Sequence, residues 1–315
     1  MEQGSLQERY LSRSVVKHIR KWDKGLRAGA MVGGDFSLLD GVITADGMGD
    51  SPMVAWTKAM NNFACSGGVA KGVRILLLLP ENVKESNLKE YMSAFNLFSE
   101  SDKIQILGGH SQVSKAFLSP QFEVTVIGEE AGFRQKKKEI KPGYSIIMTK
   151  FAGVLGTDII LKNKYDKLSE RFAKSYLAGA SMGKEMYSVT PEARLVADDV
   201  CYMHDVSHGG IYGALWQLGS WLNKGFLIEH GSINIKQETI ELCEYLNINP
   251  YLLDGTGALL AIAEDGKGVV KGLEEQGVLA AVIGTVTDNN EKLIVMNEID
   301  VRTLSPVNGD EIYSI

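Results

Sequence analysis

The chain has 315 residues, of which 44% are hydrophobic and 23% are charged, and its formal net charge is −6 at pH 7. This length and composition predict a soluble globular protein with two domains, each large enough to bury a core. The mild acidity argues against nucleic acid as the main partner. The one basic run, Arg134–Lys138 with Lys141, precedes a Pro-Gly turn and is interpreted as a solvated loop.

Cysteine usage and hydropathy indicate the compartment. Cys65, Cys201 and Cys243 lie far apart, so they predict neither a disulfide framework nor a zinc site and fit a reducing cytoplasm. The N-terminus lacks the apolar core of a signal peptide. The longest apolar run, Ile75–Pro80, is too short to span a bilayer. We therefore expect a cytoplasmic protein with no membrane partner.

The first half of the chain alternates helical and strand patterns, which predicts an α/β domain. In chain order, the sequence predicts a helix over 6–22, a strand at 42–45, a helix over 52–66, a strand over 69–79, a helix over 85–99, and strands at 103–107 and 122–127. The apolar residues of Val73–Leu79 do not alternate, which indicates a strand covered on both faces.

Lys141-Pro142-Gly143 interrupts this pattern and places the domain boundary between residues 138 and 145, giving domains 1–140 and 141–315. The second half is also predicted to be α/β. Its expected helices lie near 152–162, 166–179, 191–199, 208–223, 237–246 and 267–276, and its expected strands at 144–149, 226–229, 257–263, 279–286 and 292–296.

Acidic and amide side chains in the first half are candidate ligands for a metal. Gly33-Gly34-Asp35 and Thr44-Ala45-Asp46-Gly47 place two aspartates at the ends of short strands, and Mg²⁺ held against phosphates needs such hard oxygen ligands. The alternative for Asp46-Gly47 is an ordinary turn. Asn61-Asn62 are poor helix formers inside the 52–66 helix. They are either metal-facing amides or solvated ones.

Two glycine-rich clusters follow strands. Gly108-Gly109-His110-Ser111 comes directly after the strand at 103–107, where the glycines would expose backbone N–H groups to a phosphate or form a plain turn. Thr149-Lys150 with Gly153–Thr157 again places glycines and hydroxyls before a helix. This second pattern matches neither a Walker P-loop nor a Rossmann fingerprint.

The stretch Met203–Ile211 is the most informative part of the sequence. It places His204, Asp205, Ser207 and His208 and the pair Gly209-Gly210 in front of an amphipathic helix. Unpaired N–H groups at a helix start suit an anion, and a nearby aspartate can hold the metal that neutralises it. The alternative is an ordinary helix start capped by Ser207.

Taken together and in order, these clusters resemble the aminoimidazole ribonucleotide synthase-like (PurM-like) superfamily over about Val32–Thr287. That superfamily includes selenophosphate synthetase, thiamine-monophosphate kinase and the hydrogenase-maturation protein that dehydrates a carbamoylated cysteine. The motifs that carry the resemblance are Gly34-Asp35, Thr44-Ala45-Asp46, Asn61-Asn62 through Ser66-Gly67, Gly108–Ser111, Thr149-Lys150 with Gly153–Thr157, His204–Gly210 and Gly255-Thr256-Gly257.

The chain also departs from members of the superfamily. It ends Asp310–Ile315 without a cysteine, which argues against the hydrogenase-maturation reaction by that mechanism, and no cysteine precedes Cys65, as selenophosphate synthetase would need. Asn62 and His110 occupy the places of two acids of the kinase-type metal site, so we expect weaker Mg²⁺ binding. The chain most resembles the AIR synthase-related and hydrogenase-maturation-like proteins of undefined substrate.

The resemblance implies a two-domain α/β fold whose N-terminal domain pairs with a second subunit to close a β-barrel, so a homodimer is expected. It implies an enzyme that uses ATP and Mg²⁺ to activate a small-molecule or protein-borne acyl or amide group through a phosphorylated intermediate. A nucleotide-binding partner or maturation protein without turnover is the alternative.

The resemblance also assigns roles to individual residues. The implied metal ligands are Asp35, Asp46, Asn62 and Asp205. The implied cofactor-binding residues are Asp35, Asp46, Asn61, Gly108, Gly109, Gly209 and Gly210. The implied catalytic residues are His204, Lys150 and His110.

Overall fold

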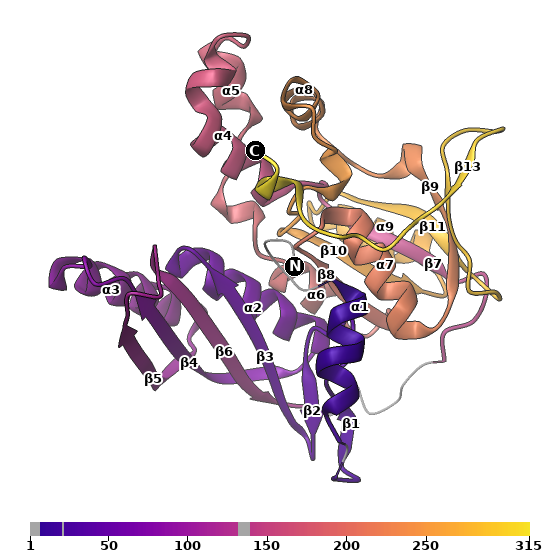
Figure 1. Ribbon diagram of the computed structural model, residues 1–315. Helices are drawn as coiled ribbons and strands as arrows, with labels where there is room; N and C mark the ends of the chain where they lie inside the picture. Colours follow the sequence, from indigo (N-terminus) through magenta and orange to yellow (C-terminus); the bar gives the residue numbers. More distant parts are fainter. Residues whose placement is uncertain (1–6, 21, 132–138) are drawn as a thin grey trace. The chain divides into compact units, whose positions relative to one another are not determined.

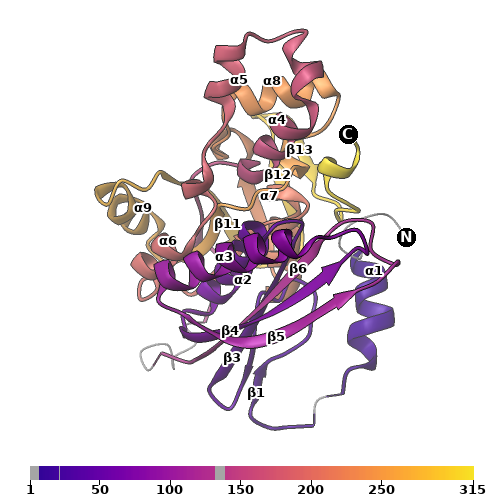
Figure 2. The ribbon, with the colours of Figure 1, turned by 90° about the vertical axis from the view of Figure 1, so that its left-hand side faces the viewer.

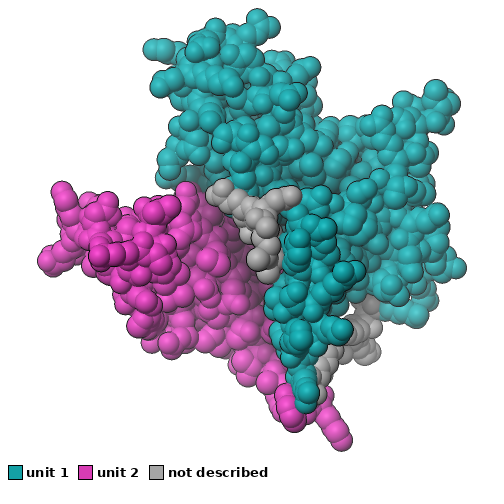
Figure 3. Space-filling view, in the orientation of Figure 1, with its two compact units in different colours: residues 1–20, 30–34, 136–315 teal, residues 21–29, 35–135 magenta. Residues whose placement is uncertain are grey.

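The computed structural model describes residues 7–20, 22–131 and 139–315 and divides the chain into two units (Figure 3). The N-terminal unit comprises residues 21–29 and 35–135. The C-terminal unit comprises residues 136–315 together with 1–20 and 30–34. The units therefore differ from the predicted ranges 1–140 and 141–315 mainly in the two early segments that join the C-terminal unit. The basic run at 134–138 lies outside the described residues.

The N-terminal unit is a six-stranded sheet in the order β1-β2-β3-β6-β4-β5, antiparallel except for the parallel pair β4 and β5. Two helices, α2 and α3, lie along one face of this sheet (Figure 2). The elements are β1 Leu26–Ala28, β2 Ser37–Leu39, β3 Val42–Gly49, α2 Pro52–Ser66, β4 Val69–Leu79, α3 Glu85–Asp102, β5 Gln105–Val113 and β6 Gln121–Glu129.

Local sequence explains the position of α2. The Ser51 hydroxyl accepts a hydrogen bond from the Val54 amide, Pro52 occupies the first turn, and the helix ends at Gly67 in the left-handed conformation. Its buried face packs on the inward side chains of the sheet, among them Ile43 and Val126, and together they form one hydrophobic core. The predicted helix at 52–66 and strand at 69–79 are confirmed residue for residue.

Side chains alternate across this sheet. Ile43 and Ala45 of β3 point into the α2 core, so Thr44, Asp46 and Met48 lie on the face turned away from α2. On β4 the inward set is Val73, Ile75, Leu77 and Leu79. Leu76 and Leu78, half-buried, lie on the other face. The strand that did not alternate in sequence is therefore apolar on both of its faces.

The C-terminal unit is a seven-stranded mixed sheet in the order β13-β12-β9-β11-β7-β10-β8. Its strands are β7 Ser145–Thr149, β8 Tyr202–Val206, β9 Gly225–Glu229, β10 Ala258–Ala263, β11 Ala280–Thr287, β12 Lys292–Val295 and β13 Val301–Thr303. Its α-helices are α1 Glu8–Tyr10, α4 Val154–Ser169, α5 Lys174–Ala180, α6 Thr190–Val196, α7 Gly210–Leu222, α8 Gln237–Leu246 and α9 Gly266–Glu275. Short η segments lie at η1 Leu11–Val15, η2 Val16–His18, η4 Lys184–Met186, η5 His230–Ser232, η6 Pro250–Leu252 and η7 Glu311–Tyr313.

Helix α7 forms the core of this unit. Ile211, Leu215 and Leu218 of α7 pack against β7, β10 and β11, while α9 contacts the same sheet and packs against α6. Figure 1 shows α7 beside the strands of this sheet, with the yellow C-terminal segment running from β13 across it. No helix in the described ranges combines the length and apolar character that crossing a bilayer requires.

Two predicted boundaries are wrong. The strand expected at 103–107 continues to Val113, so Gly108–Ser111 lies inside β5 and not in a loop after it. Residues 202–206 form strand β8, which the sequence did not suggest because its polar residues resembled a loop. In addition, α4 extends to Ser169 across a kink at Lys164, which shifts the second predicted helix to α5.

Candidate functional site

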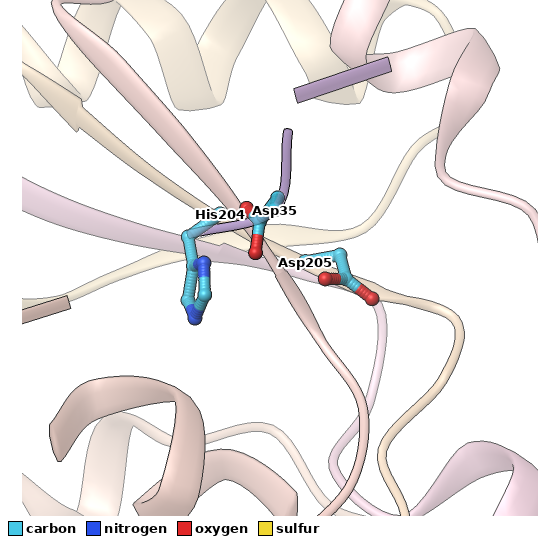
Figure 4. A group of neighbouring side chains, drawn as sticks. All are labelled: Asp35, His204 and Asp205. Atoms are coloured by element: carbon cyan, nitrogen blue, oxygen red, sulfur yellow. The ribbon is translucent and has the colours of Figure 1, made fainter. Parts of the chain in front are cut away.

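His204 and Asp205 are adjacent on β8 and almost completely buried, at 1% and 3% exposure. Backbone pairing with Leu260 and Leu259 of β10 fixes their positions. The His204 Nε2 lies 3.2 Å from the Gln217 Oε1 of α7. A ring nitrogen of His204 and a carboxylate oxygen of Asp205 lie within 4.8 Å of each other (Figure 4). A buried imidazole and carboxylate at this separation can share a metal ion or pass a proton.

The segment Ala30–Gly34 belongs to the same unit and lies against α7. A Cβ added at Gly33 would lie 2.8 Å from the Gln217 Cβ, and one at Gly34 would lie 2.9 Å from the Trp221 ring. These glycines therefore allow the backbone to approach the helix that carries the partner of His204. Asp35 is the next residue in the chain.

The Gly209-Gly210 loop differs from the prediction of open N–H groups. The Gly209 N–H donates to the Asp310 Oδ2 at 2.7 Å, and the Gly210 N–H donates to the Ser207 carbonyl at 3.1 Å. The Asp310 carboxylate also accepts from the amides of Asp254 and Ile312. An anion position is therefore present at the start of α7, but a carboxylate of the chain itself occupies it.

Packing alone explains why residue 210 is a glycine, without any bound ligand. Its φ is +64°, and an added Cβ would lie 2.5 Å from the Tyr251 carbonyl and 2.7 Å from the Leu253 carbonyl. Only glycine fits between α7 and the η6 backbone at this distance. A phosphate-binding role for Gly209 and Gly210 remains a prediction.

Lys150 lies at the end of β7 in a buried polar network. Its Nζ is 2.6 Å from the Glu192 Oε1 and donates to the Ser188 carbonyl at 2.6 Å. Burial lowers the pKa of Lys150, and the Glu192 carboxylate opposes that shift. The ammonium is therefore already matched by a carboxylate, and a further role toward phosphate stays a prediction.

The predicted residues of the N-terminal unit are more exposed. Asp46 is exposed within β3, and its backbone carbonyl accepts a hydrogen bond from the Asn62 Nδ2 at 2.7 Å. Asn61, one residue earlier on α2, is fully buried. The structure thus brings Asn62 to the strand that carries Asp46, although the two are 16 residues apart.

Glu123 is a residue of this site that the sequence did not reveal. It lies on β6 opposite Met48, two residues from Thr125, the partner of Asp46. Burial raises the pKa of Glu123, and the neighbouring Asp46 carboxylate raises it further. Asp46 and Glu123 thus form an acidic pair on the face turned away from α2. Strand alternation in Phe122–Ile127 was the only signal for it.

Gly108, Gly109 and His110 lie on β5, which is an edge strand of its sheet. An added Cβ at Gly109 would lie 1.8 Å from the Ile75 carbonyl, so this glycine allows close approach to β4. His110 is exposed. The roles predicted for these residues toward a nucleotide remain predictions.

Comparison with known proteins agrees with this fold. Residues 141–296 match the family described as AIR synthase related protein, C-terminal domain. A putative hydrogenase expression/formation protein of Methanocaldococcus jannaschii is 24% identical, covering 84% of this chain and 78% of its own length. The carbamoyl dehydratase HypE of Rhizobium leguminosarum is 21% identical, covering 81% of this chain and 76% of its own length. The crystal structure of hydrogenase maturation protein HypE in complex with ATP is similar at a TM-score of 0.72 and 14% identity, covering 98% of this chain and 94% of that one.

Proposed function

Because this chain is a PurM-like protein of the AIR synthase-related, HypE-like type, we propose that it binds ATP and uses it to activate an acyl or amide group. The observation that carries the proposal is the likeness to an ATP-bound HypE over 98% of the chain. The γ-phosphoryl group of ATP would pass to an oxygen of the acceptor and turn it into a leaving group. The acceptor is a small molecule or a group carried by a protein.

The donor set fits a hard cation. In the N-terminal unit, Asp46 and Glu123 contribute carboxylates on one sheet face. In the C-terminal unit, Asp205 contributes a separate, buried carboxylate. Bound Mg²⁺ would neutralise phosphate charge and orient the triphosphate. We assign Asp46 and Glu123 to the metal in the N-terminal unit. Asn62 holds the Asp46 backbone from the α2 side of the sheet, and its role as a metal ligand stays a prediction.

In the C-terminal unit we assign His204 and Asp205, both drawn in Figure 4, to a second group, while Asp35 of the N-terminal unit keeps its predicted role as a metal ligand. The support is that both side chains are almost completely buried on β8, with ligand atoms within 4.8 Å of each other. In this assignment His204, held by Gln217, orients the acceptor or moves its proton. His110 and Lys150 retain their predicted roles in substrate contact and charge balance.

A homodimer through the N-terminal unit is part of the proposal. Leu76 and Leu78 of β4 and Met48 of β3, which is 55% exposed, give the sheet face turned away from α2 an apolar character. Light scattering at micromolar concentration should give twice the mass of the chain, and Leu76→Asp should give a monomer. A monomeric wild-type protein would contradict this part of the proposal.

A nucleotide-binding partner protein without turnover is the second candidate. Two observations favour it, namely the replacement of two acids by Asn62 and His110 and the occupation of the Gly209 N–H by Asp310. Its fold and ATP binding would be the same, but no product would form.

Thermal unfolding with ATP, ADP and Mg²⁺ tests binding first. A ligand specific to the folded state at a hundredfold excess over its dissociation constant stabilises by about 2.7 kcal/mol, so the melting temperature should rise with nucleotide concentration. An unchanged melting temperature with every nucleotide would contradict both candidates. Where binding is found, ADP release in the presence of carboxamide or carbamoyl acceptors indicates the enzyme, and its absence indicates the partner protein.

A further inference from the structure

The C-terminal unit contains a cavity of about 960 Å³ that none of the predicted site residues explains. One wall is the C-terminal segment 302–314, and the opposite wall comes from α7, η5 and η6. Ile294, Met296, Leu252 and Leu304 add apolar surface. A cavity of this size accommodates a small-molecule ligand.

Three aromatic side chains line the cavity, and Tyr251 contacts the other two. The Tyr212 and Tyr251 rings are stacked, with centroids 5.2 Å apart and an interplanar angle of 16°. The His230 ring lies 4.6 Å from Tyr251 at 53°. Such a wall attracts a planar ring, because stacked π systems add to the free energy of burying their area.

The polar edges of these rings are available to a ligand. Among the described residues, neither the Tyr212 nor the Tyr251 hydroxyl has a hydrogen-bond partner, and the His230 ring makes no side-chain hydrogen bond. Burial raises the pKa of Tyr212 to about 12, so its hydroxyl stays a neutral donor. Both phenols can therefore bond to a ligand with donors and acceptors on its rim.

Charge at the cavity indicates an uncharged ligand. The Arg302 guanidinium is bound by the Asp300 carboxylate through two nitrogens, at 2.7 and 3.0 Å, so its charge is already matched. Burial, and next to it Arg302, lower the pKa of His230, which keeps that ring neutral at physiological pH. The Asp310 carboxylate is likewise bonded by backbone amides, so neither of these charged groups requires a charged ligand.

We propose that this cavity is a binding site for an uncharged heteroaromatic ring of the nucleobase type, stacked on the open face of the Tyr212–Tyr251 pair, with its polar rim hydrogen-bonded to groups that line the cavity. The site belongs entirely to the C-terminal unit and does not depend on ATP binding elsewhere in the chain. Its ligand would be the base-like part of an acceptor or a separate effector.

Calorimetric titration with adenosine, guanosine, cytidine and uridine tests the proposal, because free nucleosides carry the ring without phosphate. At least one should bind at millimolar or lower concentration. Tyr212→Leu should weaken that binding at least about tenfold, since it removes the stacking face. Tyr212→Phe keeps the face and loses one hydroxyl, so we expect a loss of about threefold to tenfold. Tyr165→Leu, at an exposed tyrosine on α4 outside the cavity, should change nothing.

The same titration repeated with saturating Mg-ATP separates this cavity from any nucleotide site. Unchanged nucleoside affinity in the presence of ATP supports the proposal, whereas displacement by ATP overturns it. No binding of any of the four nucleosides to the wild-type protein, or equal binding by a Tyr212→Leu protein that melts like the wild type, overturns it as well.

Discussion

The two units hold their polar clusters in different ways. In the C-terminal unit His204, Asp205 and Asp310 are each at most 3% exposed, and hydrogen bonds fix His204 and Asp310. In the N-terminal unit Asp46 and His110 are exposed on strands. A buried charge must be compensated by its own protein, whereas an exposed one can exchange water for a ligand at little cost. Motifs that look equally functional in the sequence can therefore differ in how easily their side chains bind a ligand.

It follows that changes in the N-terminal cluster should alter ligand binding with little effect on folding. Changes in the C-terminal cluster should first alter stability. The predictions below test this contrast.

The largest effect is expected for Asp46→Ala. Losing an exposed carboxylate at the proposed metal should weaken Mg-ATP binding at least about tenfold while the melting temperature without ligand stays unchanged. Asp50→Ala, at an exposed aspartate just beyond β3, is the matched control and should bind like the wild type. Calorimetry that finds equal Mg-ATP affinity for Asp46→Ala would remove Asp46 from the site.

Asp310→Ala should show the opposite pattern. The buried carboxylate accepts from three backbone amides, so its removal should lower the free energy of unfolding by about 3 kcal/mol. Denaturant unfolding measures this loss. Inorganic phosphate should stabilise the variant more than the wild type, because the anion position is then open.

Asp300→Ala is the control for that experiment, since Asp300 pairs with Arg302 at the surface and should leave the free energy of unfolding nearly unchanged. A phosphate effect of the same size on Asp310→Ala and the wild type would show that the start of α7 is not an anion site.

A smaller effect is expected when acids are restored in the N-terminal unit. The double substitution Asn62→Asp with His110→Asp should tighten Mg²⁺ binding in the presence of a non-hydrolysable ATP analogue, because each carboxylate adds charge and a hard oxygen. It should also lower the metal-free melting temperature, since clustered carboxylates repel one another. Equal Mg²⁺ affinities and equal melting temperatures would mean that these two positions do not face a metal.

The smallest effect concerns the titration of Glu123. Its folded pKa lies above the ordinary value of 4.5, so between the two values the folded chain binds more protons than the unfolded chain. This group therefore stabilises the fold fully below pH 4.5 and loses that contribution as pH rises through its folded pKa. Asp46→Asn should bring the pKa closer to 4.5, as measured by carboxyl NMR. An unchanged pKa of Glu123 in Asp46→Asn would show that the two carboxylates do not interact.

Regular patterns in the sequence predicted much of the fold. Helix α2 was predicted at 52–66 and β4 from its continuous apolar run, because local signals specify both. Strand β8 was missed because its buried polar residues are paired with β10, about 55 residues later. The continuation of β5 through Gly108-Gly109 was missed because the glycines were interpreted as a turn. In the structure Gly109 instead allows close packing on β4.

The candidate site was predictable only where its residues are close together in the chain. His204, Asp205 and the glycine pair form one motif, but the carboxylate on the Gly209 amide comes from Asp310, 101 residues later. Glu123 reaches Asp46 only through the pairing of β3 with β6. Such contacts depend on sheet order, which a local pattern does not encode.

Amide NMR with Mg²⁺ and a non-hydrolysable ATP analogue tests the central claim most directly, because it locates the nucleotide without any substitution. We predict that the resonances of Asp46 and Gly47 on β3 and of Asn62 on α2 shift in a saturable way. A titration that leaves β3 and α2 unshifted would contradict the proposed ATP site.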